Sequence, residues 1–182
     1  MALTFTPFAD LGNTCPDFTL PAVDGKTYSL KDFKNGQPLV VMFICNHCPY
    51  VQAIEDRLIA LGIDLKKQNV NVVAICSNDA SDHPEDSFEN LQKRAQEKNY
   101  SFVYLHDESQ KTAHLFGAVC TPDYFVYDKD LKLAYRGRLD DSWKDASKVT
   151  QRELYNAVQT LLKGEKVSEN QTASMGCSIK WV

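Results

Sequence analysis

Long hydrophobic runs and an excess of positive charge are both missing from this chain of 182 residues. No segment approaches the roughly 20 apolar residues that a membrane-spanning helix needs, so no membrane partner is expected. The net charge of −4 gives no electrostatic reason to expect a nucleic acid partner. The first ten residues lack the basic region of a secretory leader, which predicts a cytoplasmic protein.

Metal-binding and cofactor-binding patterns are scarce as well. The sequence has one C-x-x-C motif, from Cys45 to Cys48, with no second such motif and no H-x₃₋₅-H pair, so no structural zinc site is predicted. Covalent haem attachment needs histidine directly after the second cysteine, where Pro49 stands. No cofactor is therefore predicted. Six cysteines in a cytoplasmic chain do not indicate a disulfide framework, so at least one pair should be redox-active or metal-binding.

The C-x-x-C motif lies where an apolar strand pattern, residues 38–44, meets a helical pattern that runs from residue 49 to 67. Unpaired N–H groups at a helix N-terminus favour thiolate over thiol. We predict that Cys45 is the exposed nucleophile at the helix cap and that Cys48, one turn inside, is the resolving thiol. A protonated His47 beside them would stabilise the reduced form; alternatively, His47 is a solvated loop residue.

Strand and helix patterns alternate along most of the chain. Asp24-Gly25 predicts an N-terminal β-hairpin, and Thr150-x-x-Glu153 predicts a capping box at the start of the last helix. The order of elements favours an α/β fold, with a central mixed sheet flanked by helices. Strands are expected at 18–20, 27–30, 39–44, 70–76, 102–105, 124–127 and 131–136, and helices at 49–67, from 82, at 109–116 and from 150 to 164.

A second motif, Cys120-Thr121-Pro122, precedes the strand expected at 124–127. Together with Gly12-x-x-Cys15-Pro16-Asp17-Phe18 and the C-x-x-C segment, it resembles the thioredoxin superfamily, and within it the peroxiredoxin-like alkyl hydroperoxide reductase/thiol-specific antioxidant branch. The resemblance covers about residues 8–163. It implies a thioredoxin-like domain over residues 1–164 and a C-terminal tail over residues 165–182. It also implies that Pro122 is cis and that the backbone of Thr121 pairs with a substrate chain as an added strand.

Several positions depart from the family patterns. Thioredoxins carry a buried acidic residue six positions before the first cysteine, and this chain has Leu39 there. Peroxiredoxins use P-x₃-T-x₂-C, and the same spacing here gives Val41, Cys45 and Cys48, which removes the threonine hydroxyl that positions peroxide. These departures weaken both the hypothesis of a general disulfide reductase and the hypothesis of a peroxidase.

The four other cysteines fall into two groups. Cys15 and Cys76 are expected in the core. Cys120 adjoins the predicted cis-proline and is a candidate for an additional redox role. Cys177 lies in an apolar segment after a polar linker, so it is either a third thiol that exchanges with Cys45 or an idle thiol on a docked tail. Arg136 and Arg138 are expected to be solvated surface charges.

Three functional hypotheses follow. The first is a cytoplasmic thiol–disulfide oxidoreductase that acts on a protein or small-molecule disulfide and is recycled by a cellular thiol reductant. The second is a thiol peroxidase that uses Cys48 or Cys45. The third is a non-enzymatic redox sensor or metal-handling module in which Cys45, Cys48 and His47 hold a soft metal.

Overall fold

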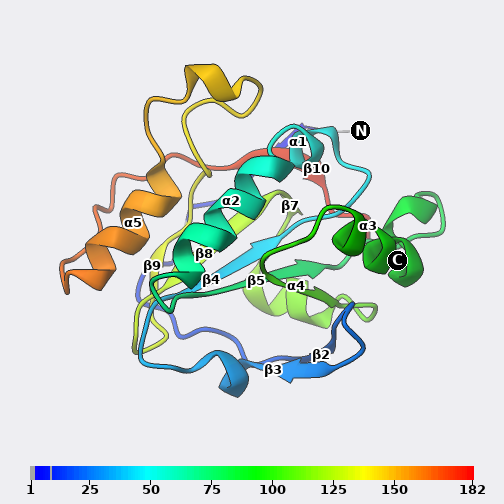
Figure 1. Ribbon diagram of the computed structural model, residues 1–182, viewed down its shortest axis with the longest axis horizontal. Helices are drawn as coiled ribbons and strands as arrows, with labels where there is room; N and C mark the ends of the chain where they lie inside the picture. The colour runs from blue at the N-terminus through cyan, green and yellow to red at the C-terminus, as the bar shows by residue number, and fades with distance from the viewer. Residues whose placement is uncertain (1–2, 9) are drawn as a thin grey trace.

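A five-stranded mixed sheet forms the centre of the computed structural model, which describes residues 3–8 and 10–182 (Figure 1). The strand order is β6-β5-β4-β8-β9, in which β4, β5 and β6 are parallel, and β8 and β9 are antiparallel to their neighbours. The bounds are β4 (Leu39–Phe43), β5 (Asn71–Cys76), β6 (Val103–His106), β8 (Asp123–Tyr127) and β9 (Leu133–Tyr135). Every residue of β4 is buried, as its continuous apolar run predicts for a central strand.

Helices cover both faces of this sheet, so the predicted thioredoxin-like α/β fold is confirmed. Val40 and Met42 pack into the core under α2 (Glu55–Lys66), α3 (Phe88–Glu97) and α5 (Glu153–Leu162). Val41 and Phe43 point the other way, toward α4 (Lys111–Phe116) and the predicted N-terminal hairpin, β2 (Thr19–Pro21) and β3 (Thr27–Ser29). Figure 1 shows α2 and α5 in front of the sheet and α4 behind it. None of the described helices is long and apolar enough to cross a membrane.

A second, three-stranded sheet joins the two ends of the described chain beside the C-x-x-C motif. Its order is β1 (Leu3–Phe5), β10 (Met175–Ser178), β7 (Cys120–Thr121), with both pairings antiparallel. Neither β1 nor β10 is among the strands expected from the sequence. The segment predicted as a tail therefore returns to the body of the protein through β10, which lies beside α1 in Figure 1, and Ile179 after it is buried.

Candidate active site around Cys48

The C-x-x-C motif follows β4 and ends at a helix only one turn long. Cys48 is the N-cap of α1 (Pro49–Gln52), and Pro49 takes the first helical position, where its missing N–H is no loss. The continuous helix predicted over residues 49–67 is wrong: α1 ends at Gln52, and α2 starts at Glu55. A four-residue helix has little dipole, so the thiolate needs other stabilising groups.

Those groups are other thiols and backbone N–H groups. The pKa of Cys48 is lowered to about 5, and the largest cause is a hydrogen bond from the Cys45 thiol. Burial opposes this shift. The thiol and N–H of Cys177 and the N–H of Val51 lower the pKa further. Burial and the bond to Cys48 raise the pKa of Cys45 well above its usual value, and the nearby Asp86 carboxylate adds to this. Burial and the bond to Cys48 likewise raise the pKa of Cys177 to about 12. Cys48 is thus the central thiolate of a three-thiol group.

This arrangement corrects two expectations for Cys45. It is not the exposed cysteine, because Cys45 and Cys48 are only 1% and 0% exposed. It is also not the cysteine at the helix cap, since α1 starts at Pro49, as predicted, and its N-cap is Cys48. The raised pKa of Cys45 disfavours its thiolate, whereas the lowered pKa of Cys48 favours its own.

Thr121 and Pro122 face the two cysteines of the motif. The Thr121–Pro122 peptide bond is cis, as predicted. The Thr121 hydroxyl lies 3.2 Å from Cys45 Sγ, and the Cys48 thiol lies 3.2 Å from the Thr121 carbonyl oxygen. The backbone expected to pair with a substrate chain pairs instead with β10, in which Cys177 lies directly opposite Thr121.

His47 is held by a buried carboxylate that was not predicted. Its Nδ1 lies 2.5 Å from Asp86 Oδ2 and 3.7 Å from Cys45 Sγ. Asp86 also accepts hydrogen bonds from the N–H groups of Asn46 and His47 and from the Asn78 amide, and it is fully buried. His47 is therefore a fixed part of the site and not a solvated loop residue. No sequence signal marked Asp86, which follows Pro84-Glu85 in a short 3₁₀ turn.

Cys45, His47 and Asp86 also bring three donor atoms within 4.8 Å of one another. Sulfur, imidazole nitrogen and carboxylate oxygen are all zinc ligands, so the donor set itself suits a metal. Two ligands about 2 Å from one tetrahedral ion lie roughly 3.3 Å apart. The 2.5 Å contact between His47 and Asp86 is much shorter and is that of a hydrogen bond. This geometry does not fit a bound ion.

Two other candidates lie outside the three-thiol group. Cys120 is fully buried, and burial raises its pKa far above the usual range, so nothing activates its thiol. The expectation that Arg136 is a solvated charge is wrong, because its guanidinium is buried and pairs with Asp123 at 2.8 Å. Arg138 is partly exposed and pairs with Glu153.

A buried, low-pKa thiolate opposite a cis-proline, on a mixed sheet covered by helices, defines a thioredoxin-like redox protein. Comparison with known proteins gives the family. Residues 11–136 match the AhpC/TSA family, and the chain belongs to it. A curated relative, "Putative peroxiredoxin bcp" of Helicobacter pylori, is 28% identical over 109 residues, which span 60% of this chain and 66% of that protein, just under two thirds of its length.

Several solved structures share the fold of this chain. An uncharacterized conserved protein from Geobacillus kaustophilus is 44% identical, with a TM-score of 0.95 over 100% of this chain and 97% of its own. A hypothetical protein from Sinorhizobium meliloti 1021 is 40% identical, with a TM-score of 0.94 over 98% of each chain. Peroxidoxin BcpB from Mycobacterium tuberculosis, at 20% identity and a TM-score of 0.63, covers 84% of this chain and 96% of its own, and it shares the fold.

Proposed function

We propose that the protein is a thiol–disulfide oxidoreductase in which Cys48 attacks a disulfide and Cys45 resolves the mixed disulfide. One observation carries this proposal: Cys45 and Cys48 both face the cis Thr121–Pro122 bond, where the Cys45 sulfur lies 3.2 Å from the Thr121 hydroxyl and the Cys48 sulfur 3.2 Å from the Thr121 carbonyl oxygen. The contact with the Cys45 thiol lowers the pKa of Cys48, which favours its thiolate, and the resolving partner is already beside it. The product is a Cys45–Cys48 disulfide, which a cellular thiol reductant returns to the dithiol. The proposed compartment is the cytoplasm, where reducing thiol pools are available.

A peroxidase reaction is the second candidate, and the place of Cys48 favours it. Cys48 holds the last position of the peroxiredoxin-like spacing Val41-x₃-Cys45-x₂-Cys48, and the family match supports the same chemistry. The Thr121 hydroxyl contacts Cys45 and not Cys48, so no hydroxyl in this arrangement replaces the missing threonine at position 45. Disulfide exchange, which needs no such hydroxyl, is therefore the leading proposal.

The two roles can be separated with single-cysteine variants. In Cys45→Ser, oxidised glutathione should form a stable mixed disulfide on Cys48, detected by intact-protein mass spectrometry as one added glutathione. In Cys48→Ser, no adduct should form at Cys45, because its pKa is raised. Cys15→Ser, in the core on the other face of the sheet, is the matched control and should behave like the wild type. An adduct on Cys45 in Cys48→Ser would reverse the assignment.

A further inference from the structure

Asp86 supports the turn between the two cysteines of the motif, but it also places a negative charge beside Cys45. Its Oδ1 accepts hydrogen bonds from the backbone N–H groups of Asn46 and His47, at 2.7 and 3.1 Å. Burial is the largest cause of the raised pKa of the Cys45 thiol, followed by the bond to Cys48 and then by the charge of Asp86. The site therefore needs groups that offset this charge and still leave the turn in place.

Two side chains donate hydrogen bonds to the other oxygen of this carboxylate. The Asn78 amide nitrogen donates to Asp86 Oδ2 at 2.8 Å. His47 Nδ1 lies 2.5 Å from the same oxygen, and it is the donor because a carboxylate only accepts. With the two backbone N–H groups, Asp86 receives four donors, which fill its lone pairs. Asn78 and Asp86 are only 4% and 0% exposed, so bulk water does not take the place of a donor that is removed.

The C-terminal segment fixes the direction in which the Asn78 amide points. The backbone N–H of Lys180 donates to Asn78 Oδ1 at 3.0 Å. Because a backbone N–H can only donate, the amide oxygen faces Lys180 and the amide nitrogen faces Asp86. The Lys180 carbonyl is held in turn by the N–H of Asp79 and the side-chain amide of Gln110, at 2.8 and 2.7 Å. Asn78 thus links the C-terminal segment to Asp86.

His47 connects this network to the Cys45 sulfur. Its Nδ1 lies 3.7 Å from Cys45 Sγ, a distance at which an N–H group can donate to sulfur. The ring of His83 stacks on that of His47 at 4.0 Å and an angle of 4°, which holds the imidazole in place. Hydrogen bonding to a carboxylate stabilises its charged form. Asp86, with Asn78 already bonded to Oδ2, therefore draws the Nδ1 proton less strongly and leaves that N–H available to Cys45.

We propose that Asn78 is a positioning residue for the resolving step: it holds the Asp86–His47 pair so that the N–H of His47 stabilises the Cys45 sulfur during its attack on the mixed disulfide at Cys48. The inference rests on the proposed function and adds a residue to its second step. In that step the Cys45–Cys48 S–S bond forms, and the bond from Cys48 to the substrate sulfur breaks. The Cys45 proton passes to the departing thiolate, which leaves as a thiol.

The substitution Asn78→Asp separates this role from simple anchoring of the C-terminal segment. Aspartate has the same shape and keeps an acceptor for the Lys180 N–H, but its second oxygen replaces the donor to Asp86. Two adjacent carboxyl groups share one proton at low pH and repel each other once both are ionised. The variant should therefore behave like the wild type at about pH 5 and lose the resolving step as the pH rises. A residue that only anchored the segment would tolerate the change at every pH.

Other titratable groups also face Asp86 from the surrounding elements. They are Cys45, Cys76 at the end of β5, Tyr104 in β6, His47 and, stacked on His47, His83. Burial raises the pKa of the two thiols and of the tyrosine well above their usual values, so none of the three changes charge between about pH 5 and 8. Both histidines are present in the wild type and in the variant, so the ratio of the two rates removes their contribution.

Single-turnover reaction with oxidised glutathione measures the two steps separately. Samples quenched with acid and analysed by intact-protein mass spectrometry show the Cys48–glutathione adduct form and then decay to the disulfide-bonded protein. In Asn78→Asp we expect the decay to match the wild type at about pH 5 and to be at least about tenfold slower at about pH 8, as for the loss of a hydrogen bond to a charged group. Adduct formation should keep the wild-type rate, because thiols and backbone N–H groups support the Cys48 thiolate.

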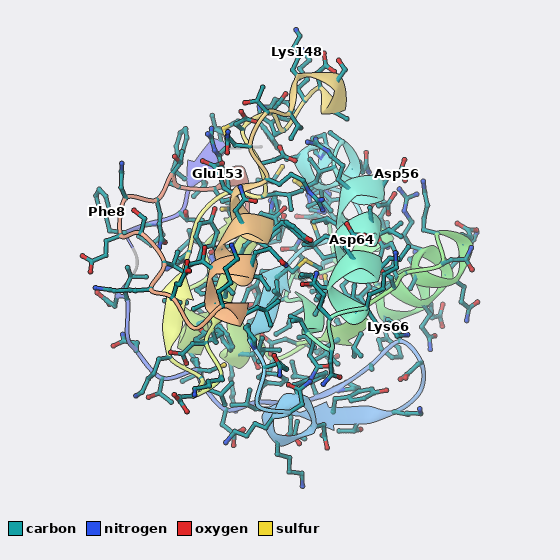
Figure 2. The ribbon with its side chains drawn as sticks, turned by 60° about the vertical axis from the view of Figure 1, so that its left-hand side comes forward. Phe8, Asp56, Asp64, Lys66, Lys148 and Glu153 are labelled. Carbon is teal, nitrogen blue, oxygen red and sulfur yellow. The ribbon has the colours of Figure 1, made fainter. Side chains whose placement is uncertain are left out.

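Two further variants complete the comparison. Asn78→Ala removes the donor without adding a charge and should slow the decay at every pH. Asn156→Asp adds the same charge at an exposed position of α5, the helix that starts at Glu153 in Figure 2, and should match the wild type in both steps. Wild-type decay in Asn78→Asp at both pH values would overturn the inference. Equal slowing of both steps would also overturn it, because that result indicates a general distortion of the site.

A measurement without substrate separates failure of the inference from failure of the proposed function. If the wild type forms no adduct with glutathione, the proposed function fails, and alkylation of Cys45 by iodoacetamide still tests the role of Asn78. Labelling of Cys45, located by mass spectrometry, should be slower in Asn78→Asp than in the wild type at about pH 8 and equal to it at about pH 5. Equal labelling at both pH values would overturn the inference whatever the activity shows.

Discussion

The substitution Gly176→Ala should release β10 from the site. The added methyl carbon would lie 1.9 Å from the Thr121 carbonyl oxygen and 2.6 Å from its carbonyl carbon, both backbone atoms that cannot rotate away. An ordinary contact is roughly 3.5 Å, so the strand has to retreat by roughly 1.5 Å. Overpacking of this kind costs about 1–3 kcal/mol, and each lost backbone hydrogen bond costs about 1 kcal/mol. We expect a destabilisation of about 2–4 kcal/mol, which leaves a typical domain folded.

The chemical consequence falls on Cys48. Retreat of β10 removes the hydrogen bonds from the Cys177 thiol and N–H but keeps the larger contribution from Cys45. The pKa of Cys48 should therefore rise from about 5 toward the ordinary thiol range. Its sulfur, which is fully buried in the wild type, should become accessible. The rate of Cys48 alkylation by iodoacetamide is followed from pH 4 to 9, with mass spectrometry to identify the labelled cysteine. In Gly176→Ala the midpoint of the rate–pH curve should move to higher pH, and the rate at the plateau should be higher than in the wild type.

Ser178→Ala is the matched control, because it changes the same strand without adding bulk against Thr121, and it should keep the wild-type profile. If Gly176→Ala gives the wild-type midpoint and the wild-type urea stability, β10 does not support the Cys48 thiolate, and the view of the site as a three-thiol group is wrong.

Three further outcomes are expected. Asp86→Asn should lower the free energy of unfolding by about 1–3 kcal/mol in urea titrations. It should also make Cys45 easier to alkylate, because a nearby negative charge is removed. The control Glu85→Gln, at an exposed position, should change neither the stability nor the alkylation rate. Burial raises the pKa of Asp123 to about 6, above its unfolded value of about 3.9, so its contribution to stability is full below about pH 4 and is lost as the pH rises through 6. The unfolding free energy of the wild type relative to Asp123→Asn should fall over that interval, and a flat difference would contradict the assignment. Cys120 should resist alkylation until the protein unfolds, and labelling of the native protein would contradict its burial.

The central sheet was predictable because each of its strands has a local signal. The apolar run of β4 predicts a strand covered on both faces, and the Asp24-Gly25 turn predicts the hairpin, as observed. The cis geometry of Pro122 came from resemblance to a family and not from any local pattern. Periodicity and turn chemistry report on neighbours within a few residues, and these elements depend on such neighbours.

The site itself depends on contacts that span most of the chain. β10 is four residues long and shows no alternation, and its Cys177 meets Thr121 only through tertiary pairing. Local signals also failed where a distant partner competed for the same group. The hydroxyl of Thr150, expected to cap the last helix, bonds to Asp141 instead, and Arg152 is the N-cap. Thioredoxins have a buried acidic residue at the position of Leu39. In this chain the buried carboxylate at the site is that of Asp86, which comes from another element and contacts His47. No spacing rule predicts this residue.

The place of Cys177 in the chain has a consequence for biosynthesis. The thiol and N–H that complete the Cys48 environment lie 129 residues after it (177 − 48). At about 5–20 residues per second, roughly 6–26 s pass between synthesis of the nucleophile and synthesis of its last stabilising partner. Throughout that interval Cys48 lacks two of its hydrogen bonds and stays closer to an ordinary, less ionised thiol. The low pKa of Cys48 is therefore complete only when the final strand docks.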